Sequence, residues 1–158
     1  MFGTQPSTTV ADHQITPAVK VRALDAFGNV ATGFTGAVAI ALGSNPGGST
    51  LSGTTPVAAV SGVATFSVSL NKAGTGYTLT TSASGFTPVT STAFDITPGT
   101  ATQLAFTVQP SNTVAGAAIS PAVQITALDP AGNPVPSFTG SVTVSLGKIG
   151  RASCRERV

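Results

Sequence analysis

Alternation between apolar and polar residues is the clearest pattern in this chain. Val19, Val21 and Ala23 alternate with the charged residues Lys20 and Arg22. Successive side chains of a β-strand point to opposite faces, so a spacing of two indicates one buried face and one solvated face. The pattern therefore predicts a half-buried strand whose two charged side chains face water.

The same alternation predicts further strands along the chain. Val38, Ile40 and Leu42 are separated by alanines, so every second position again carries a large apolar side chain. Clusters of glycine, proline, serine and asparagine separate such segments, and clusters of this kind form turns. Besides residues 19–23 and 38–42, strands are expected over residues 55–59, 63–70, 77–83 and 91–96.

The turn clusters and strand lengths together predict the architecture. Turns are expected at residues 45–48, 61–62 and 73–76, and the glycine-rich stretch Gly43–Gly53 is expected to be a loop without the Gly-Lys-Ser/Thr ending of a phosphate-binding loop. About seven short strands in roughly a hundred residues are typical of a two-sheet antiparallel β-sandwich. Its core is expected to contain Phe66, Val68, Leu70, Tyr77, Leu79, Phe94 and Ile96.

Composition agrees with an all-β fold. Charged residues make up only 8% of the 158 residues, hydrophobic residues make up 41%, and threonine plus serine supply 41 residues. Threonine and valine favour strands, whereas the residues on which long helices depend, such as leucine, glutamate and lysine, are scarce here. The sequence therefore predicts an all-β chain without long helices and without direct membrane insertion.

Part of the chain is repeated at a fixed separation of 104 residues. Gln5–Gly43 align with Gln109–Gly147 without a gap, and 21 of the 39 aligned pairs are identical. The second copy opens with a strand-like segment over residues 103–108, and its alternating apolar positions are Val123, Ile125, Ala127, Val142, Val144 and Leu146. We therefore expect residues 1–96 to form one repeat that lacks most of its first strand. Residues 97–148 are expected to form the N-terminal half of a truncated second repeat, which makes the chain a fragment cut at both ends.

The last ten residues, 149–158, differ abruptly in composition from the rest. They contain the only cysteine, Cys154, and three of the seven cationic residues, namely Arg151, Arg155 and Arg157. The segment resembles one translated reading frame of a short-read sequencing adapter, and we interpret it as a non-native tail. Without it four cations, including Lys148, balance four acids, so the pI of about 9.1 is a property of the tail. A nucleic-acid partner, which a basic tail would favour, is therefore not expected.

An Asp-x-x-Gly-Asn motif follows the predicted strand in both copies, as Asp25–Asn29 and as Asp129–Asn133. With its flanking strands, this segment resembles the bacterial immunoglobulin-like repeats of invasin and intimin type. Residues 62–66 and 73–79 look like later strands of that family, and the resemblance covers nearly all of residues 1–148. It implies tandem immunoglobulin-like β-sandwiches in an exported bacterial surface protein. In such proteins most copies are spacers whose partners are neighbouring repeats, and recognition is often left to a terminal module.

The aspartates of this motif have two interpretations. A turn that leaves a strand needs a short acceptor, which Asp25 supplies, and a residue that tolerates positive φ, which Gly28 or Asn29 supplies. As calcium ligands, Asp25 and Asp129 would need about six to eight oxygens around one ion, and neither has an acidic neighbour in sequence. We favour the turn interpretation. Because Asp95 lies beside the segment that joins the copies, a calcium-stiffened junction stays open.

We expect the other candidate binding residues to have structural rather than binding roles. Tyr77, the sole tyrosine, is expected to anchor a sandwich corner through its hydroxyl, with a sugar-stacking platform as the alternative. Lys20 and Arg22 become Gln124 and Thr126 in the second copy, which indicates a solvated surface rather than a binding patch. The same interpretation applies to His13, which is opposite an alanine in the second copy.

Catalysis is not expected, because the chain has few groups that could perform it. Outside the tail it contains four acids, one histidine and no cysteine, whereas acid–base or nucleophilic catalysis needs a base beside a nucleophile or two close carboxylates. No catalytic, cofactor-binding or metal-ligating residue is therefore assigned. The expected function is a non-catalytic spacer or stalk repeat at the cell surface. The alternatives are an adhesion module that binds carbohydrate or a receptor, and an accessory module of an extracellular enzyme.

Overall fold

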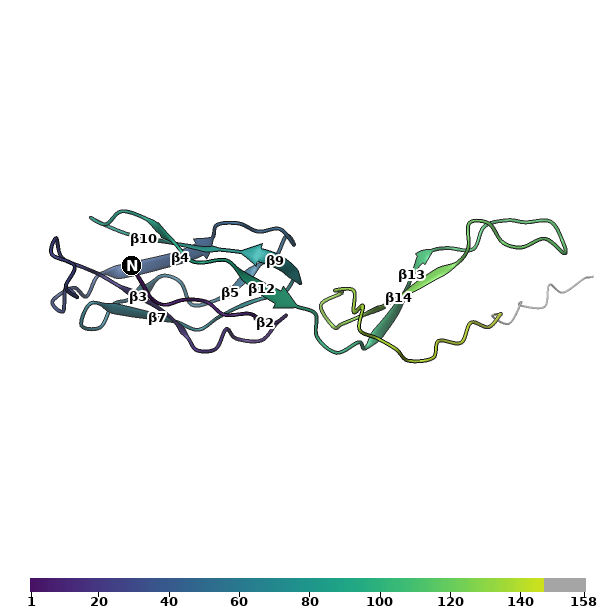
Figure 1. Cartoon of the computed structure of the whole chain (residues 1–158), viewed down its shortest axis with the longest axis horizontal. Coiled ribbons are helices and arrows are strands. Elements are labelled where there is room, and N and C mark those ends of the chain that lie inside the picture. Colours follow the sequence, from purple (N-terminus) through teal and green to yellow (C-terminus); the bar gives the residue numbers. More distant parts are fainter. Residues whose placement is uncertain (147–158) are drawn as a thin grey trace, which may run out of the picture.

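The structure is a computed structural model, and it describes residues 1–146. Every regular element in this range is a β-strand and none is a helix, so the predicted all-β class is confirmed (Figure 1). Lys148 and the whole of the predicted non-native tail, Cys154 and its arginines included, lie outside the described residues.

The strands are short and follow one another along the whole described range. In chain order they are β1 (Phe2–Thr4), β2 (Thr9–Val10), β3 (Val19–Arg22), β4 (Ala37–Leu42), β5 (Leu51–Gly53), β6 (Val57–Ala58), β7 (Val63–Phe66), β8 (Val68–Leu70), β9 (Gly74–Tyr77), β10 (Leu79–Ala83), β11 (Val89–Thr90), β12 (Phe94–Thr97), β13 (Gln103–Val108) and β14 (Gln124–Leu128).

Within residues 1–97 these strands form several small sheets. The orders are β1-β3-β7, β11-β10-β4-β6 and β2-β12-β9, with β5 and β8 as a separate pair. Every pairing is antiparallel except that of β2 with β12, which is parallel and departs from the all-antiparallel expectation. This arrangement is consistent with a β-sandwich.

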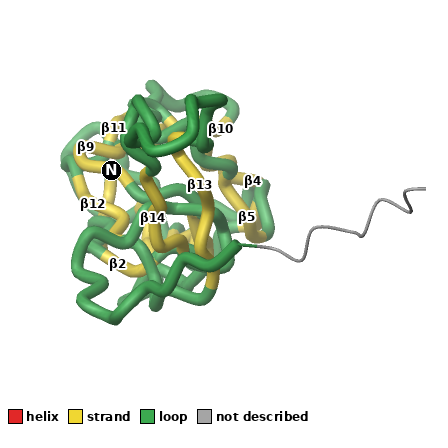
Figure 2. The backbone as a smooth tube through the Cα atoms, turned by 90° about the vertical axis from the view of Figure 1, so that its right-hand side faces the viewer, coloured by secondary structure: helices red, strands yellow, loops and turns green. Residues whose placement is uncertain are grey.

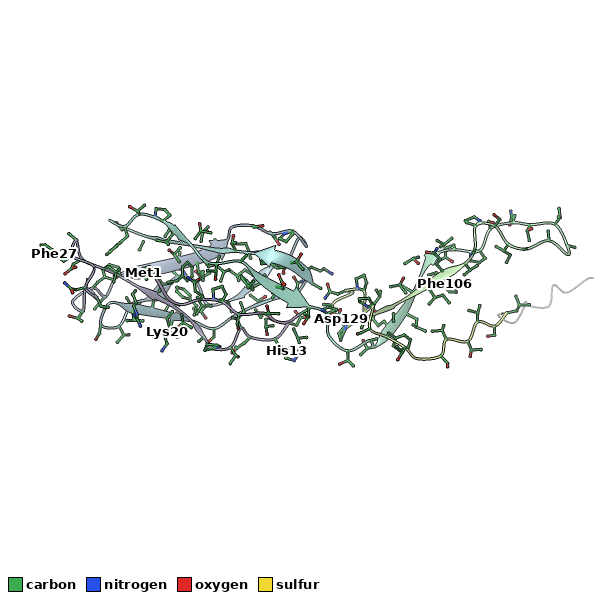
Figure 3. All side chains as sticks on the ribbon, viewed as in Figure 1. Met1, His13, Lys20, Phe27, Phe106 and Asp129 are labelled. Carbon is green, nitrogen blue, oxygen red and sulfur yellow. The ribbon has the colours of Figure 1, made fainter. Side chains whose placement is uncertain are left out.

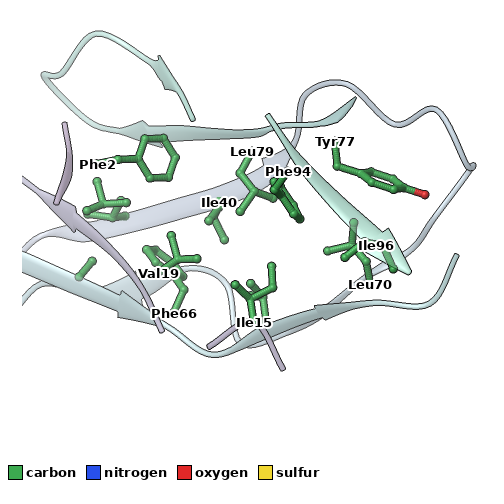
Figure 4. Close-up of a cluster of buried hydrophobic side chains, with 14 of the residues drawn as sticks. Phe2, Ile15, Val19, Ile40, Phe66, Leu70, Tyr77, Leu79, Phe94 and Ile96 are labelled. Carbon is green, nitrogen blue, oxygen red and sulfur yellow. The ribbon is translucent and has the colours of Figure 1, made fainter. Parts of the chain in front are cut away.

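One hydrophobic cluster fills the space between these sheets (Figure 4). All seven predicted core residues belong to it, and each is at most 4% exposed. In β3, Val19 and Val21 point into the cluster while Lys20 and Arg22 are exposed. The alternation in the sequence therefore identified the buried face correctly, and burial of these side chains is the main force that holds the sheets together.

Two of the predicted strands are each broken into two. Residues 63–70 split at Ser67 into β7, which pairs with β3, and β8, which pairs with β5. Residues 77–83 split at Thr78, whose amide donates to the Ser44 carbonyl while its own carbonyl accepts from Gly43. The alternation of buried side chains continues across both breaks, so the change of partner strand left no mark in the hydrophobic pattern.

Two segments predicted as loops contain strands. The last three residues of the glycine-rich stretch form β5, and the turn cluster at residues 73–76 contributes most of β9. Gly53 and Gly76 have positive φ values of 127° and 84°, so glycine serves here for irregular strand geometry rather than for a chain reversal. The prediction of uninterrupted turns at these places was wrong.

Two other strands are shorter than predicted because hydroxyl groups replace part of the ladder. Thr55 Oγ1 accepts from the Ile40 amide at 2.9 Å and donates to the Ile40 carbonyl at 3.2 Å, and the strand starts only at Val57. Ser91 Oγ likewise accepts from the Leu79 amide at 2.9 Å, ahead of the strand that starts at Phe94.

We call residues 1–97 the N-terminal body and residues 98–146 the C-terminal segment. The C-terminal segment extends from the end of the N-terminal body where β12 finishes (Figure 1). Seen along the long axis, β13 and β14 lie in front of the N-terminal sheets (Figure 2). Strand β13 covers the predicted residues 103–108 and pairs with β14. The strand predicted around Val142 and Val144 does not form, because β4, at the matching positions, is held by β10 and β6, and the described residues contain no counterparts of these two strands.

The C-terminal segment is therefore expected to be less protected than the N-terminal body. Leu104 and Phe106 of β13 are about half exposed, and β13 pairs with a single strand. Pairs of strands without a covered apolar face are marginal in water. Amide hydrogen exchange should be faster in β13 and β14 than in β3 and β7. Equal protection of both strand pairs would contradict the expectation that the C-terminal segment lacks a covered core.

Candidate functional site

The turn after β14 lies against the end of the N-terminal body, and this junction is the most elaborate polar arrangement in the described residues (Figure 3). Asp129 Oδ1 accepts from the Asn133 amide at 2.8 Å, and its Oδ2 accepts from Asn133 Nδ2 at 2.8 Å. Oδ2 also accepts from the Gly99 amide at 2.9 Å. Asp129 is 1% exposed, so one buried carboxylate both closes the turn and binds the segment that joins the two parts.

Asn133 continues these contacts into the loop between β8 and β9. Its Oδ1 accepts from the Ala73 amide at 3.0 Å, and its Nδ2 donates to the Asn71 carbonyl at 3.0 Å. Lys72 Nζ donates to the Ala131 carbonyl at 2.6 Å. The turn Asp129–Asn133, the C-terminal turn, is thus bonded to three consecutive residues of the N-terminal body. The bonded residues are 59 to 62 positions apart in the sequence.

The loop that receives the turn is held in place by its own side chains. Asn71 Oδ1 accepts from the Thr50 amide at 2.8 Å and from Ser49 Oγ at 3.1 Å. Ser49 Oγ in turn accepts from the Asn71 amide at 3.0 Å. These bonds to residues 49 and 50 fix the loop of residues 71–73 within the N-terminal body. The groups of this loop that bind the turn of residues 129–133 are therefore oriented before the turn contacts them.

Asp129 remains ionised in this site. Burial would raise the pKa of its carboxyl, but the hydrogen bonds from the Asn133 side chain and from the Gly99, Asn133 and Ala131 amides outweigh it, so the pKa is lowered from 3.8. Donors that bind the charged form favour that form. The junction is therefore assembled around a negative charge that the protein compensates with neutral donors.

The junction is expected to open in acid. Because the pKa of Asp129 is lower in the folded protein than its ordinary 3.8, its contribution to stability is complete above about pH 5 and is lost as the pH falls through the folded pKa. Hydrogen exchange at the Gly99 and Asn133 amides should accelerate on acidification beyond the intrinsic change in exchange rate. In Asp129→Asn, which does not titrate, this additional acceleration should be absent, and its persistence would contradict the assignment.

The matching turn, Asp25–Asn29, lies at the opposite end of the molecule. Asp25 Oδ1 accepts from the Phe27 and Asn29 amides, both at 2.9 Å, and Oδ2 accepts from Asn29 Nδ2 at 3.3 Å. These bonds, led by the Asn29 amide, lower the pKa of Asp25. The predicted role of the aspartate as turn acceptor is therefore confirmed, and Gly28 supplies the positive φ, at 85°.

The calcium interpretation gains no ligand set from the fold. Asp95 Oδ1 accepts from the Gly76 amide at 2.9 Å, within the β12–β9 pair. Among residues 1–146, no group of three or more histidine, cysteine or acidic side chains is placed to hold a metal ion. Each aspartate of the two motifs is instead surrounded by amide donors.

Tyr77 has the anchoring role predicted for it. Its side chain is 0% exposed, and its hydroxyl donates to the Lys72 carbonyl at 2.8 Å. Its ring centroid lies 6.1 Å from that of Phe94, and burial raises the pKa of the hydroxyl. A sugar-stacking role is wrong for this residue, because no face of the ring reaches solvent. The hydroxyl ties the core directly to the loop that receives the C-terminal turn.

Replacing Tyr77 with phenylalanine tests this anchor. The substitution keeps the ring but removes the hydrogen bond to the part-buried Lys72 carbonyl, which costs about 0.5–1.5 kcal/mol. We expect the free energy of unfolding, measured by urea titration with far-ultraviolet circular dichroism, to fall by that amount. An unchanged midpoint would show that the hydroxyl carries no anchoring role.

Among the remaining candidate residues, Lys20 and Arg22 take no part in the junction hydrogen bonds, whereas His13 lines a pocket at the junction with Gly99, Asp129 and Ala131. Lys20 and Arg22 are exposed on the solvated face of β3. His13 is also exposed, with its Nδ1 3.1 Å from the Ala11 carbonyl, and Figure 3 labels Lys20 and His13. The loop of residues 71–73 was missed by sequence reasoning, which gave the motif a purely local role. The available signal was the asparagine that ends both motifs, since its side chain has more hydrogen-bonding groups than one turn requires.

Comparison of the chain with protein-family models, with curated proteins and with solved structures gave no match. Within residues 1–146, the structure has no helix with the length and apolar character needed to cross a membrane.

Proposed function

We propose that this chain is a non-catalytic spacer made of tandem immunoglobulin-like repeats, part of an exported bacterial protein at the cell surface. The observation that carries the proposal is the junction, in which a buried aspartate and asparagine bind one segment to the end of the preceding one. A spacer needs its units held in series at a defined angle. The bond from Gly99 to Asp129 holds the segment that connects the two parts. The bonds between Asn133 and residues 71–73 hold the parts themselves together, so bending at the connection is restricted.

Matching strand geometry supports the tandem-repeat part of the proposal. Phe2 pairs with Val21 in the β1–β3 ladder, and 104 positions later Phe106 pairs with Ile125 in the β13–β14 ladder. Both ladders then shift register at the next pair, at Thr4 and at Val108. Equal pairing with an equal irregularity in both copies supports two units of one kind.

Surface chemistry supports a passive rather than a recognising role. The solvated faces carry threonine and serine with few charges, which hydrate a sheet without building a charged patch. The extracellular location rests on the family resemblance, and neighbouring repeats of the same protein are the partners that it implies.

A glycan array and a pull-down with cell-surface proteins test the spacer against the adhesion module. We expect no saturable binding by the full chain. Saturable binding to a glycan or a receptor would overturn the spacer proposal and favour the adhesion module. A catalytic domain encoded beside these repeats in the same gene would favour the accessory-module alternative.

A further inference from the structure

The turn Asp25–Asn29 stands exposed at the end of the molecule opposite the junction, although it has the same internal geometry as the docked turn. In both, the aspartate amide donates to the asparagine carbonyl, at 2.9 Å in one and 3.0 Å in the other. In both, the aspartate carboxylate accepts from the asparagine amide and side chain. The turn therefore folds without a partner and presents a preformed surface.

Its outward groups are those that make the junction in the second copy. Asn133 is 3% exposed and uses both ends of its amide to bind residues 71–73, whereas Asn29 is exposed and, within residues 1–146, bonds only to Asp25. The carbonyl of Phe27 corresponds to that of Ala131, which accepts from Lys72. Phe27 itself is 91% exposed at the tip of the turn (Figure 3).

We propose that the turn Asp25–Asn29 is a docking surface for the exit end of a preceding repeat of the same kind. The exit end is the surface formed by Asn71, Lys72, Ala73 and Gly99, which in this chain already holds the second copy. The turn would bind an equivalent exit end through the same contacts that Asp129 and Asn133 make. This inference rests on the proposed tandem arrangement and names its repeating interface.

Phe27 adds a feature that the second copy lacks. Ala131 at the matching position is small and half-buried beside Lys72. An exposed phenylalanine at the centre of a polar surface gains from being covered, and a lysine over an aromatic face is a favourable pair. The preceding exit end is therefore expected to carry a lysine at the position of Lys72.

The test adds a preceding unit to the full chain in register. Residues 1–104 are joined to the start of the complete chain, so that Met1 takes the place of Ala105 and the 104-residue separation is kept. Exchange at the Gly28 and Asn29 amides is compared between the original and the extended protein. We expect it to slow about tenfold or more, since several new hydrogen bonds must open together.

Two matched variants of the extended protein sharpen the test. Asn29→Ala, or Lys72→Ala in the added unit alone, should return most of the fast exchange, while protection in β3 of both units verifies folding. Unchanged exchange at Gly28 and Asn29 in a folded extended protein would overturn the docking proposal and leave the spacer function untouched. Slowed exchange together with saturable glycan binding would keep the interface and remove only the spacer function.

Discussion

Replacing Asp129 with alanine is expected to release the C-terminal segment from the N-terminal body. The substitution leaves the Gly99 amide, the Asn133 amide and Asn133 Nδ2 without their acceptor. A hydrogen bond to a charged group contributes about 1.5–3 kcal/mol, and of the three only the bond from Gly99 joins the turn to another segment, so closing of the junction should weaken by up to about 3 kcal/mol. Hydrogen exchange at the Ala73 and Gly99 amides should accelerate up to about 100-fold, by the relation between free energy and equilibrium.

The matched control for this variant is Asp25→Ala. It removes an aspartate that closes the same kind of turn but lies in solvent, far from the junction. Exchange at Ala73 and Gly99 should stay as in the original protein. Equal acceleration in both variants, or none in Asp129→Ala, would show that the carboxylate of residue 129 does not hold the junction.

Replacing Phe66 with alanine is expected to cause the largest loss of overall stability. Phe66 is 1% exposed, and in β7 it pairs with Val19 of β3, which belongs to the same hydrophobic cluster. Truncating a buried phenylalanine leaves a cavity and costs about 3–5 kcal/mol, a large part of the 5–15 kcal/mol typical of a domain. The single buried tyrosine, Tyr77, provides a fluorescence signal for urea unfolding.

Phe27→Ala is the control for the core substitution. The same chemical change at a side chain that is 91% exposed should alter the free energy of unfolding by less than about 0.5 kcal/mol. If both variants unfold at the same urea concentration, Phe66 is not part of a packed core, and the arrangement of the sheets around it is wrong.

The core could be predicted from sequence because burial follows the period of the strand. Val19, Val21, Phe66 and Leu79 occupy positions at which alternation and burial coincide, and all are buried. The exchange of partners at Ser67 could not be predicted in the same way. A strand that leaves one neighbouring strand for another keeps its alternation of buried and exposed side chains, so the hydrophobic pattern does not reveal the change of partner.

The role of the junction was only half predictable. That Asp129 accepts from its own turn follows from the short reach of an aspartate side chain. That Asn133 binds residues 71–73 does not, because the groups it meets there are the Ala73 amide and the Asn71 carbonyl. Every residue type except proline offers the same two backbone groups, so the sequence of residues 71–73 does not identify them as the place where Asn133 binds.

The expected strand over residues 142–146 failed for a related reason. Its alternation of valines matches that of β4, but a strand forms only where its backbone groups find neighbours. In the N-terminal body those neighbours are β10 and β6. Local pattern specifies which face would be buried, while the remainder of the sheet decides whether the strand exists.

The most direct test of a rigid serial arrangement is a set of residual dipolar couplings measured on the full chain at neutral pH. Amides of β3 and β7 report the orientation of the N-terminal body, and those of β13 and β14 report that of the C-terminal segment. We expect a single alignment tensor to fit both sets, and two different tensors to be needed after Asp129→Ala. Two unrelated tensors in the unaltered protein would contradict a junction held by Asp129 and Asn133.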